Sequence, residues 1–273
     1  MRDLHAFAIA CALAACGPAG RGGNGGDDDG SPPDSMQPDG NLDPSEMAFV
    51  FAHSPSTLYR IDPDTLAVST IGAFQWPNGG SDQMTDLAIN SDNVMIGISF
   101  GSVYRVDPAT AATTRLPGSL SGAFNGLSFV PAEMLGQTGP DVLVATRNDD
   151  GKVFRVDPMT GAADEVGNMG AAFQSSGDIV SVKNFGTVVT TLGAPFDVLT
   201  KLTPVTFAGS PAPSSTGFGQ IWGVAFWKGT VFGFTQTGKF ITINPNTGVA
   251  TLVQDNGPEW WGAAVTTSAP IVQ

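Results

Sequence analysis

Short segments in which apolar and polar residues alternate recur along most of the chain. One such segment covers 59–61 (YRI) and is followed by DPDT at 62–65. A period of two is typical of a half-buried β-strand. Asp followed by Pro starts a tight turn in which the carboxylate caps a nearby backbone N–H. The pattern therefore predicts a strand, a turn and a second strand at 67–71.

This strand-turn-strand pattern occurs five times. Its proline stands at Pro63, Pro108, Pro158, Pro204 and Pro245, so successive copies are 41–50 residues apart. After the turn, Gly161 and Gly248 can adopt the positive φ of a bulged hairpin. Leu66 and Ala111 stand at that place in the first two copies, so we expect those turns to differ in detail.

A further pair of apolar segments precedes each later copy of the pattern. We expect these strands at 86–89 and 94–99, 126–129 and 142–146, 178–181 and 187–191, and 223–226 and 230–235. Four short strands in every 40–50 residues are typical of one blade of a β-propeller.

The two ends of this region complete the number of blades. Residues 262–265 (GAAV) look like a first strand with no blade after it, whereas the segments 48–52 and 58–61 lack a first strand. Pairing the two ends would close the ring and leave no exposed sheet edge. We therefore expect an all-β domain over 47–273: a five-bladed β-propeller closed by its N- and C-terminal strands.

The repeats resemble bacterial propellers of the YVTN, NHL and quinoprotein-like groups over nearly all of 47–273. Quinoprotein repeats carry D-x-x-T-G, which 157–161 matches, and a Trp eight residues after the Asp. Glu165 stands at that place here, so the resemblance does not extend to a quinone cofactor.

The N-terminus has the pattern of a secretion signal over residues 1–16. Arg2 precedes a short apolar segment, which is too short to span a bilayer. The segment ends in LAAC at 13–16 and resembles the lipobox of bacterial lipoproteins. The resemblance implies that Cys16 is lipidated and becomes the first residue, with a plain signal peptide as the alternative. Gly17 after it implies a lipid-anchored protein of the cell envelope at the outer membrane.

Residues 17–46 are rich in Gly, Asp and Pro, so we expect a disordered tether. The whole chain has a net charge of −13, which argues against nucleic acid as a partner. Both cysteines precede residue 17, which excludes disulfides and cysteine-ligated metals from the propeller.

The sequence offers few groups for catalysis. His53 is the sole histidine after the signal, and we expect it in an exposed turn, so no Ser-His-Asp arrangement can form. The loops that lead into the innermost strands carry polar candidates: Asp86, Asn125, Asp178 and Glu259. They could bind Ca²⁺ or act as the acidic centre of a hydrolase. The alternative is that the aspartates cap backbone N–H groups.

The same loops carry aromatic candidates: Phe124, Trp222, Trp260 and Trp261. They could form a platform for a ligand at the mouth of the channel, or pack between blades. Together, these features favour a monomeric, non-catalytic binding module with no cofactor. Its ligand would be a protein, a peptide or a carbohydrate. The alternative is an exported hydrolase or lactonase-like enzyme with an acidic channel that binds Ca²⁺.

Overall fold

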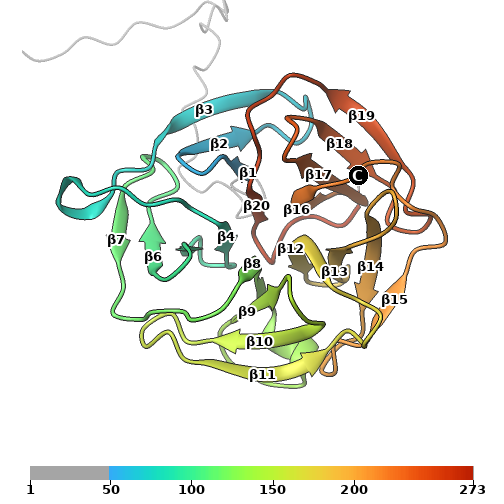
Figure 1. Cartoon of the computed structure of the whole chain (residues 1–273), viewed down its shortest axis with the longest axis horizontal. Coiled ribbons are helices and arrows are strands. Elements are labelled where there is room, and N and C mark those ends of the chain that lie inside the picture. Colours follow the sequence, from blue (N-terminus) through green and yellow to red (C-terminus); the bar gives the residue numbers. More distant parts are fainter. Residues whose placement is uncertain (1–48, 273) are drawn as a thin grey trace, which may run out of the picture. The chain divides into compact units, whose positions relative to one another are not determined.

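The chain folds as a five-bladed β-propeller, as the repeats predicted. The computed structural model describes residues 49–272, and these form five antiparallel sheets of four strands each, arranged in a ring (Figure 1). Two short 3₁₀ helices, η2 (Pro77–Gly79) and η3 (Ala132–Leu135), lie in the loops. In the part of the chain that is described, no helix is long and apolar enough to cross a membrane.

The blades are numbered from the N-terminus. Blade 1 contains β20 (Gly262–Val265), β1 (Val50–His53), β2 (Thr57–Ile61) and β3 (Val68–Ala73). Blade 2 contains β4 (Asp86–Ile89), β5 (Met95–Ile98), β6 (Val103–Val106) and β7 (Thr113–Arg115). Blade 3 contains β8 (Phe124–Val130), β9 (Val142–Arg147), β10 (Lys152–Val156) and β11 (Ala163–Asn168). Blade 4 contains β12 (Ser175–Val182), β13 (Gly186–Thr191), β14 (Val198–Leu202) and β15 (Gly209–Pro211). Blade 5 contains β16 (Ile221–Trp227), β17 (Thr230–Thr235), β18 (Phe240–Ile243) and β19 (Ala250–Gln254).

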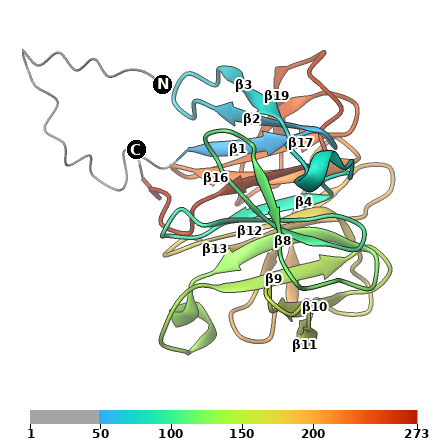
Figure 2. The ribbon, with the colours of Figure 1, turned by 90° about the vertical axis from the view of Figure 1, so that its left-hand side faces the viewer.

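Blade 1 is built from both ends of the propeller, which confirms the predicted ring closure. Strand β1 pairs antiparallel with β20, and the register runs from Val50 opposite Val265 to His53 opposite Gly262. Figure 2 shows β1 among the strands of the closed ring. The inner strands β4, β8, β12, β16 and β20 contact one another in sequence around the centre (Figure 1).

The repeated Asp-Pro turns have the predicted capping bonds. In the first copy, Asp62 Oδ1 accepts hydrogen bonds from the N–H groups of Asp64 and Thr65, both at 3.0 Å. Asp107, Asp157 and Asn244 cap their turns in the same way, whereas in the fourth copy Thr203 Oγ1 bonds to Thr206 Oγ1. These side chains have a structural role, as expected from the sequence.

The expectation that the first two turns differ from the glycine-containing ones is wrong. Leu66 and Ala111 adopt φ of 60° and 59°, close to the 72° of Gly161. Each closes the same backbone bond, from its N–H to the carbonyl of the turn aspartate, at 2.8 and 2.9 Å. That bond and the burial of the side chain offset a steric cost of roughly 1–2 kcal/mol for left-handed backbone.

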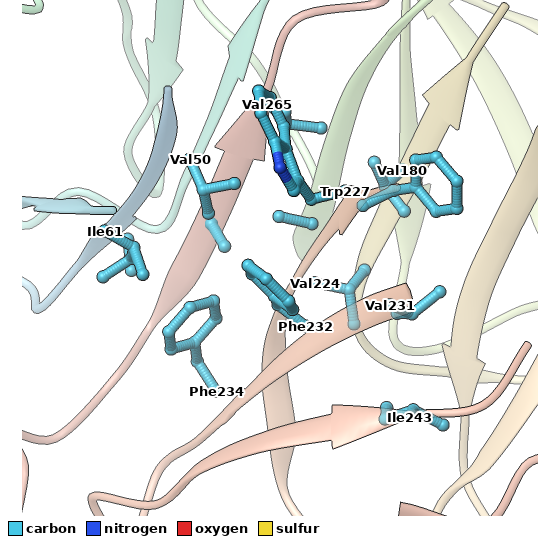
Figure 3. Close-up of a cluster of buried hydrophobic side chains, with 14 of the residues drawn as sticks. Val50, Ile61, Val180, Val224, Trp227, Val231, Phe232, Phe234, Ile243 and Val265 are labelled. Atoms are coloured by element: carbon cyan, nitrogen blue, oxygen red, sulfur yellow. The ribbon is translucent and has the colours of Figure 1, made fainter. Parts of the chain in front are cut away.

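The hydrophobic core lies between the blades. Its largest cluster joins blades 1, 4 and 5, where Val50 and Ile61 approach Phe232 and Phe234 (Figure 3). Burial of these apolar faces is the main force that holds neighbouring blades together. The predicted signal segment with Cys16 and the predicted tether at 17–46 lie outside the described residues.

Candidate functional site

The residue at one equivalent position of each inner strand determines how closely the strands approach at the centre of the ring. Just before its apolar segment, each inner strand carries an aspartate or a glycine: Asp86, Gly126, Asp178, Gly223 and Gly262. The glycines let neighbouring strands approach closely. A methyl group on Gly223 would lie 2.7 Å from the carbonyl carbon of Gly262, and one on Gly262 would overlap Asp86 Oδ1. Asp86 Oδ1 and His53 Nε2 fill the space beside Gly262, whereas other atoms of the adjacent strands fill the space beside Gly126 and Gly223.

Both carboxyl groups bridge to neighbouring blades. Asp86 Oδ2 accepts the N–H of Leu127 in blade 3 at 2.7 Å. Asp178 Oδ2 accepts the N–H of Val224 in blade 5 at 2.7 Å and that of Ala263 in blade 1 at 3.3 Å. Their Oδ1 atoms accept the N–H of the following residue at 2.8 and 2.6 Å. All four oxygens thus satisfy buried backbone donors, an arrangement that fits the capping interpretation.

Burial changes the protonation of this pair. Both side chains have an exposed fraction of 0%. Burial raises the pKa of Asp178 to about 8, and it raises the pKa of Asp86 well above its usual range. The charge of Asp178 and a hydrogen bond between the two carboxyls raise the Asp86 pKa further. The pair therefore holds at least one proton at neutral pH.

His53 does not lie in an exposed turn, so that expectation is wrong. It is the last residue of β1, fully buried, with Nε2 3.8 Å from Asp86 Oδ1. Its Nδ1 donates to the carbonyl of Ser54 at 3.0 Å. Burial lowers the pKa of His53 to about 4. The strand continues one residue further than expected because His53 pairs with Gly262 of the closing strand.

A cavity of about 370 Å³ lies where the inner strands begin. Four of the predicted site residues line it: Phe124, Asn125, Trp222 and Trp261. The remaining lining residues are Thr85, Phe100, Ala123, Asn148, Ser175, Ser176, Gly177 and Leu192. We call this cavity the mouth pocket. Among the described residues, those that line it carry no charged side chain.

Two of the lining residues that sequence reasoning missed, Thr85 and Gly177, follow a simple rule. The residue directly before the Asp or Gly position lines the mouth pocket in every blade: Thr85, Asn125, Gly177, Trp222 and Trp261. Phe100 and Leu192 come from the loops between the second and third strands of blades 2 and 4. Aligning the five inner strands would have identified the first set.

Aromatic rings form one wall of the mouth pocket. The rings of Trp222 and Trp261 lie 6.0 Å apart with an interplanar angle of 81°. Phe100 meets Trp261 at 6.2 Å, also edge to face. Such T-shaped contacts are favourable for aromatic pairs. Three buried polar atoms among the lining residues, Asn125 Oδ1, Ser176 Oγ and Trp261 Nε1, have no hydrogen-bond partner in the described part of the chain.

Besides Asp86 and Asp178, two further predicted site residues, Trp260 and Glu259, do not line the mouth pocket. Trp260 has an exposed fraction of 1% and packs against Tyr59 and Phe234, with ring centroids 5.1 and 5.3 Å apart. Neighbouring residues of an extended chain point in opposite directions, so Trp260 faces the core while Trp261 faces the pocket. Glu259 is exposed and accepts a hydrogen bond from Gln236 Nε2 at 2.9 Å.

The predicted acidic candidates come together only in part. Asp86 and Asp178 lie side by side, but within residues 49–272 no three His, Cys, Asp or Glu side chains are placed to hold a metal ion. Glu259 is therefore not part of the pair. A second cavity of about 420 Å³ on blade 3 is lined by Asp141 and Asp157 among others. Their carboxylates already accept backbone hydrogen bonds. Asp141 accepts one from the N–H of Ser91, and Asp157 accepts one from the N–H of Met159.

Comparisons with known proteins agree with the fold. No family model matches the chain, and no curated protein matches it. A chain in the structure of a nidogen–laminin complex matches with a TM-score of 0.52 and 10% identity, covering 82% of this chain and 100% of that one. A protein of unknown function from Bacteroides caccae gives 0.42 and 10%, covering 77% and 73%. The WD40 repeats of RRP9 give 0.40 and 13%, covering 76% and 59%. At 10% identity, the likeness to the chain of the nidogen–laminin complex shows a shared fold and nothing finer.

Proposed function

We propose that this chain is an exported, lipid-anchored binding module of the cell envelope. The mouth pocket is its ligand site. The observation that supports this most is the convergence of Trp222, Trp261 and Phe124 on one uncharged cavity. Ligand sites are typically concave and mostly apolar, with a few polar groups, and the mouth pocket has this composition.

Catalysis at the acidic centre has less support. A hydrolase needs carboxyl groups that reach a substrate or a water molecule. Asp86 and Asp178 are fully buried, and each of their oxygens accepts a backbone hydrogen bond. These contacts support a role for both in holding the inner strands together, and we assign the function to binding.

Anchoring through Cys16 rests on the lipobox-like LAAC segment alone. It is tested by metabolic labelling with a palmitate analogue in a bacterial host. The chain and a Cys11→Ser control should take up label, and Cys16→Ser should not. An unlabelled chain, or equal labelling of Cys16→Ser, would contradict the anchor.

The ligand site is tested by cross-linking in intact envelopes. We would compare the chain with a Trp222→Ala/Trp261→Ala double variant and with Leu252→Ala, which removes an exposed leucine from β19. We expect at least one envelope component to be cross-linked to the chain and to the Leu252→Ala control, but not to the double variant. Thermal unfolding of each variant checks folding. If all three retain the same components, the mouth pocket is not the ligand site.

A further inference from the structure

The mouth pocket continues into an exposed apolar rim. Phe100 and Leu192 line the pocket, yet 65% and 54% of their surfaces remain exposed. They lie in two separate loops, β5–β6 and β13–β14. Soluble proteins rarely leave large hydrophobic side chains together on the surface unless a partner covers them. A ligand confined to the cavity would leave these side chains in water, whereas a polypeptide lying across the mouth would cover them.

The cavity itself suits one large side chain. At about 370 Å³ it is near the lower end of the roughly 300–1,000 Å³ usual for ligand pockets. Its perpendicular tryptophans offer one ring face and one ring edge, which suits an aromatic or large aliphatic group.

The charge that remains free beside the pocket is negative. Glu259 stands two residues before Trp261 and forms no ion pair within the described region. A bond from Gln236 Nε2 holds its carboxylate, and Gln220 Nε2 in turn donates to Gln236 Oε1 at 2.7 Å. Arg147 at the end of β9 is paired with Asp149, and Lys239 in the β17–β18 loop is paired with Asp255.

From the apolar rim, the pocket size and this free carboxylate, we infer that the mouth pocket binds a protein partner. That partner inserts one aromatic or large aliphatic side chain and carries a lysine or arginine next to it, facing Glu259. The inference rests on the proposed binding function and adds the chemistry of the partner. Complementary charge at the edge of an apolar contact gives an interface its specificity.

The probes are three short peptides and one sugar. Acetyl-Lys-Phe-Lys-amide has both proposed features. Acetyl-Glu-Phe-Glu-amide reverses the charge, and acetyl-Lys-Ser-Lys-amide removes the apolar side chain. Methyl glucoside represents a carbohydrate ligand. Each is titrated into the full chain labelled with 5-fluorotryptophan and followed by ¹⁹F NMR. Trp222→Phe and Trp261→Phe assign the two pocket resonances, and Trp227, beside Asp64 in another part of the ring, serves as the internal reference.

We expect acetyl-Lys-Phe-Lys-amide to shift the Trp222 and Trp261 resonances saturably and to leave Trp227 unchanged. The Glu-flanked peptide should bind roughly fivefold more weakly, because one partly exposed ion pair contributes up to about 1 kcal/mol. Glu259→Gln should narrow that difference, and the Ser peptide should cause no shift. Saturable shifts by methyl glucoside without peptide binding would overturn the inference and leave the binding function standing. No shift by any peptide, or no effect of charge, would also overturn it.

Discussion

The carboxylate of Asp178 in blade 4 accepts the backbone N–H of Val224 in blade 5 at 2.7 Å, at the centre of the ring. A side chain on one inner strand thereby completes the hydrogen bonding of the next. Asp86 makes the equivalent bond to Leu127. Two aspartates therefore connect four of the five inner strands directly, and the bond from Ala263 to Asp178 adds the fifth.

The raised pKa of Asp178 predicts a pH dependence of stability. The carboxyl has a pKa of about 8 in the folded protein and of 3.8 in an unfolded chain, so the folded state binds the proton more tightly. Its contribution is fully present below about pH 4 and is lost as pH rises through about 8. His53, whose folded pKa is lowered to about 4 from 6.5, acts in the opposite direction up to about pH 7, because the unfolded imidazole is still partly protonated there. The aspartate therefore dominates the pH dependence from about pH 7 to about pH 8.

We expect the free energy of unfolding to fall across that window, by at most about 1.4 kcal/mol per pH unit for each proton. Asp178→Asn should make the free energy of unfolding less dependent on pH, although it also weakens the hydrogen bonds that backbone N–H groups donate to this side chain. Urea unfolding at about pH 7, 7.5 and 8 measures the slope for both chains. A flat profile for the unsubstituted chain would show that the carboxyl pair is ionised in the fold.

Close packing of the inner strands predicts a strong effect of one methyl group. Gly223→Ala would place a carbon 2.7 Å from Gly262 backbone, which forces neighbouring strands apart at a cost of about 1–3 kcal/mol. Gly101→Ala is the matched control, because nothing lies within 4 Å of its Cβ position. In urea unfolding, the free energy of unfolding should be lower for Gly223→Ala than for Gly101→Ala. Equal stability of both variants would mean that the inner strands are not in tight contact.

The two neighbouring tryptophans should respond differently to truncation. Trp260→Ala removes a fully buried ring from the core and should cost about 3–5 kcal/mol. Trp261→Ala removes a half-buried ring from the mouth pocket, and we expect less than half of that loss. Comparison of the two unfolding free energies tests the assignment. A larger loss for Trp261→Ala would place that ring in the core instead.

Calcium should have no effect on stability. A metal that binds only the folded state raises the unfolding midpoint with its concentration. Since the oxygens of Asp86 and Asp178 already accept backbone N–H groups, they are poorly available as ligands. We expect the same midpoint with millimolar Ca²⁺ and with EDTA in differential scanning calorimetry. A rise with Ca²⁺ would reveal a metal site and restore the acidic channel as a candidate centre.

Much of the fold could be predicted from the sequence because its signals are local. The Asp-Pro turn repeats five times, and its capping bonds form within three residues, as at Asp62. Strand alternation then fixes the blade. Ring closure by 262–265 followed from the number of strands, and it is confirmed by the pairing of β1 with β20.

The site was harder to predict because it depends on where side chains point after the ring closes. Trp260 and Trp261 look equivalent in sequence, but a single step along the strand separates core from pocket. Phe100 and Leu192 belong to loops far apart in the chain, and no local pattern brings them together. His53 appeared to lie in a loop because its partner strand is more than two hundred residues away.

The pairing of β1 with β20 also sets an order of events. Val50 and Val265 stand opposite each other although nearly the whole propeller separates them in the chain. Contacts of such long sequence separation form late, since loop closure must precede them. Until then blade 1 has three strands and an open edge at β1. The ring therefore cannot close before β20, the last strand of the chain, is available to pair with β1.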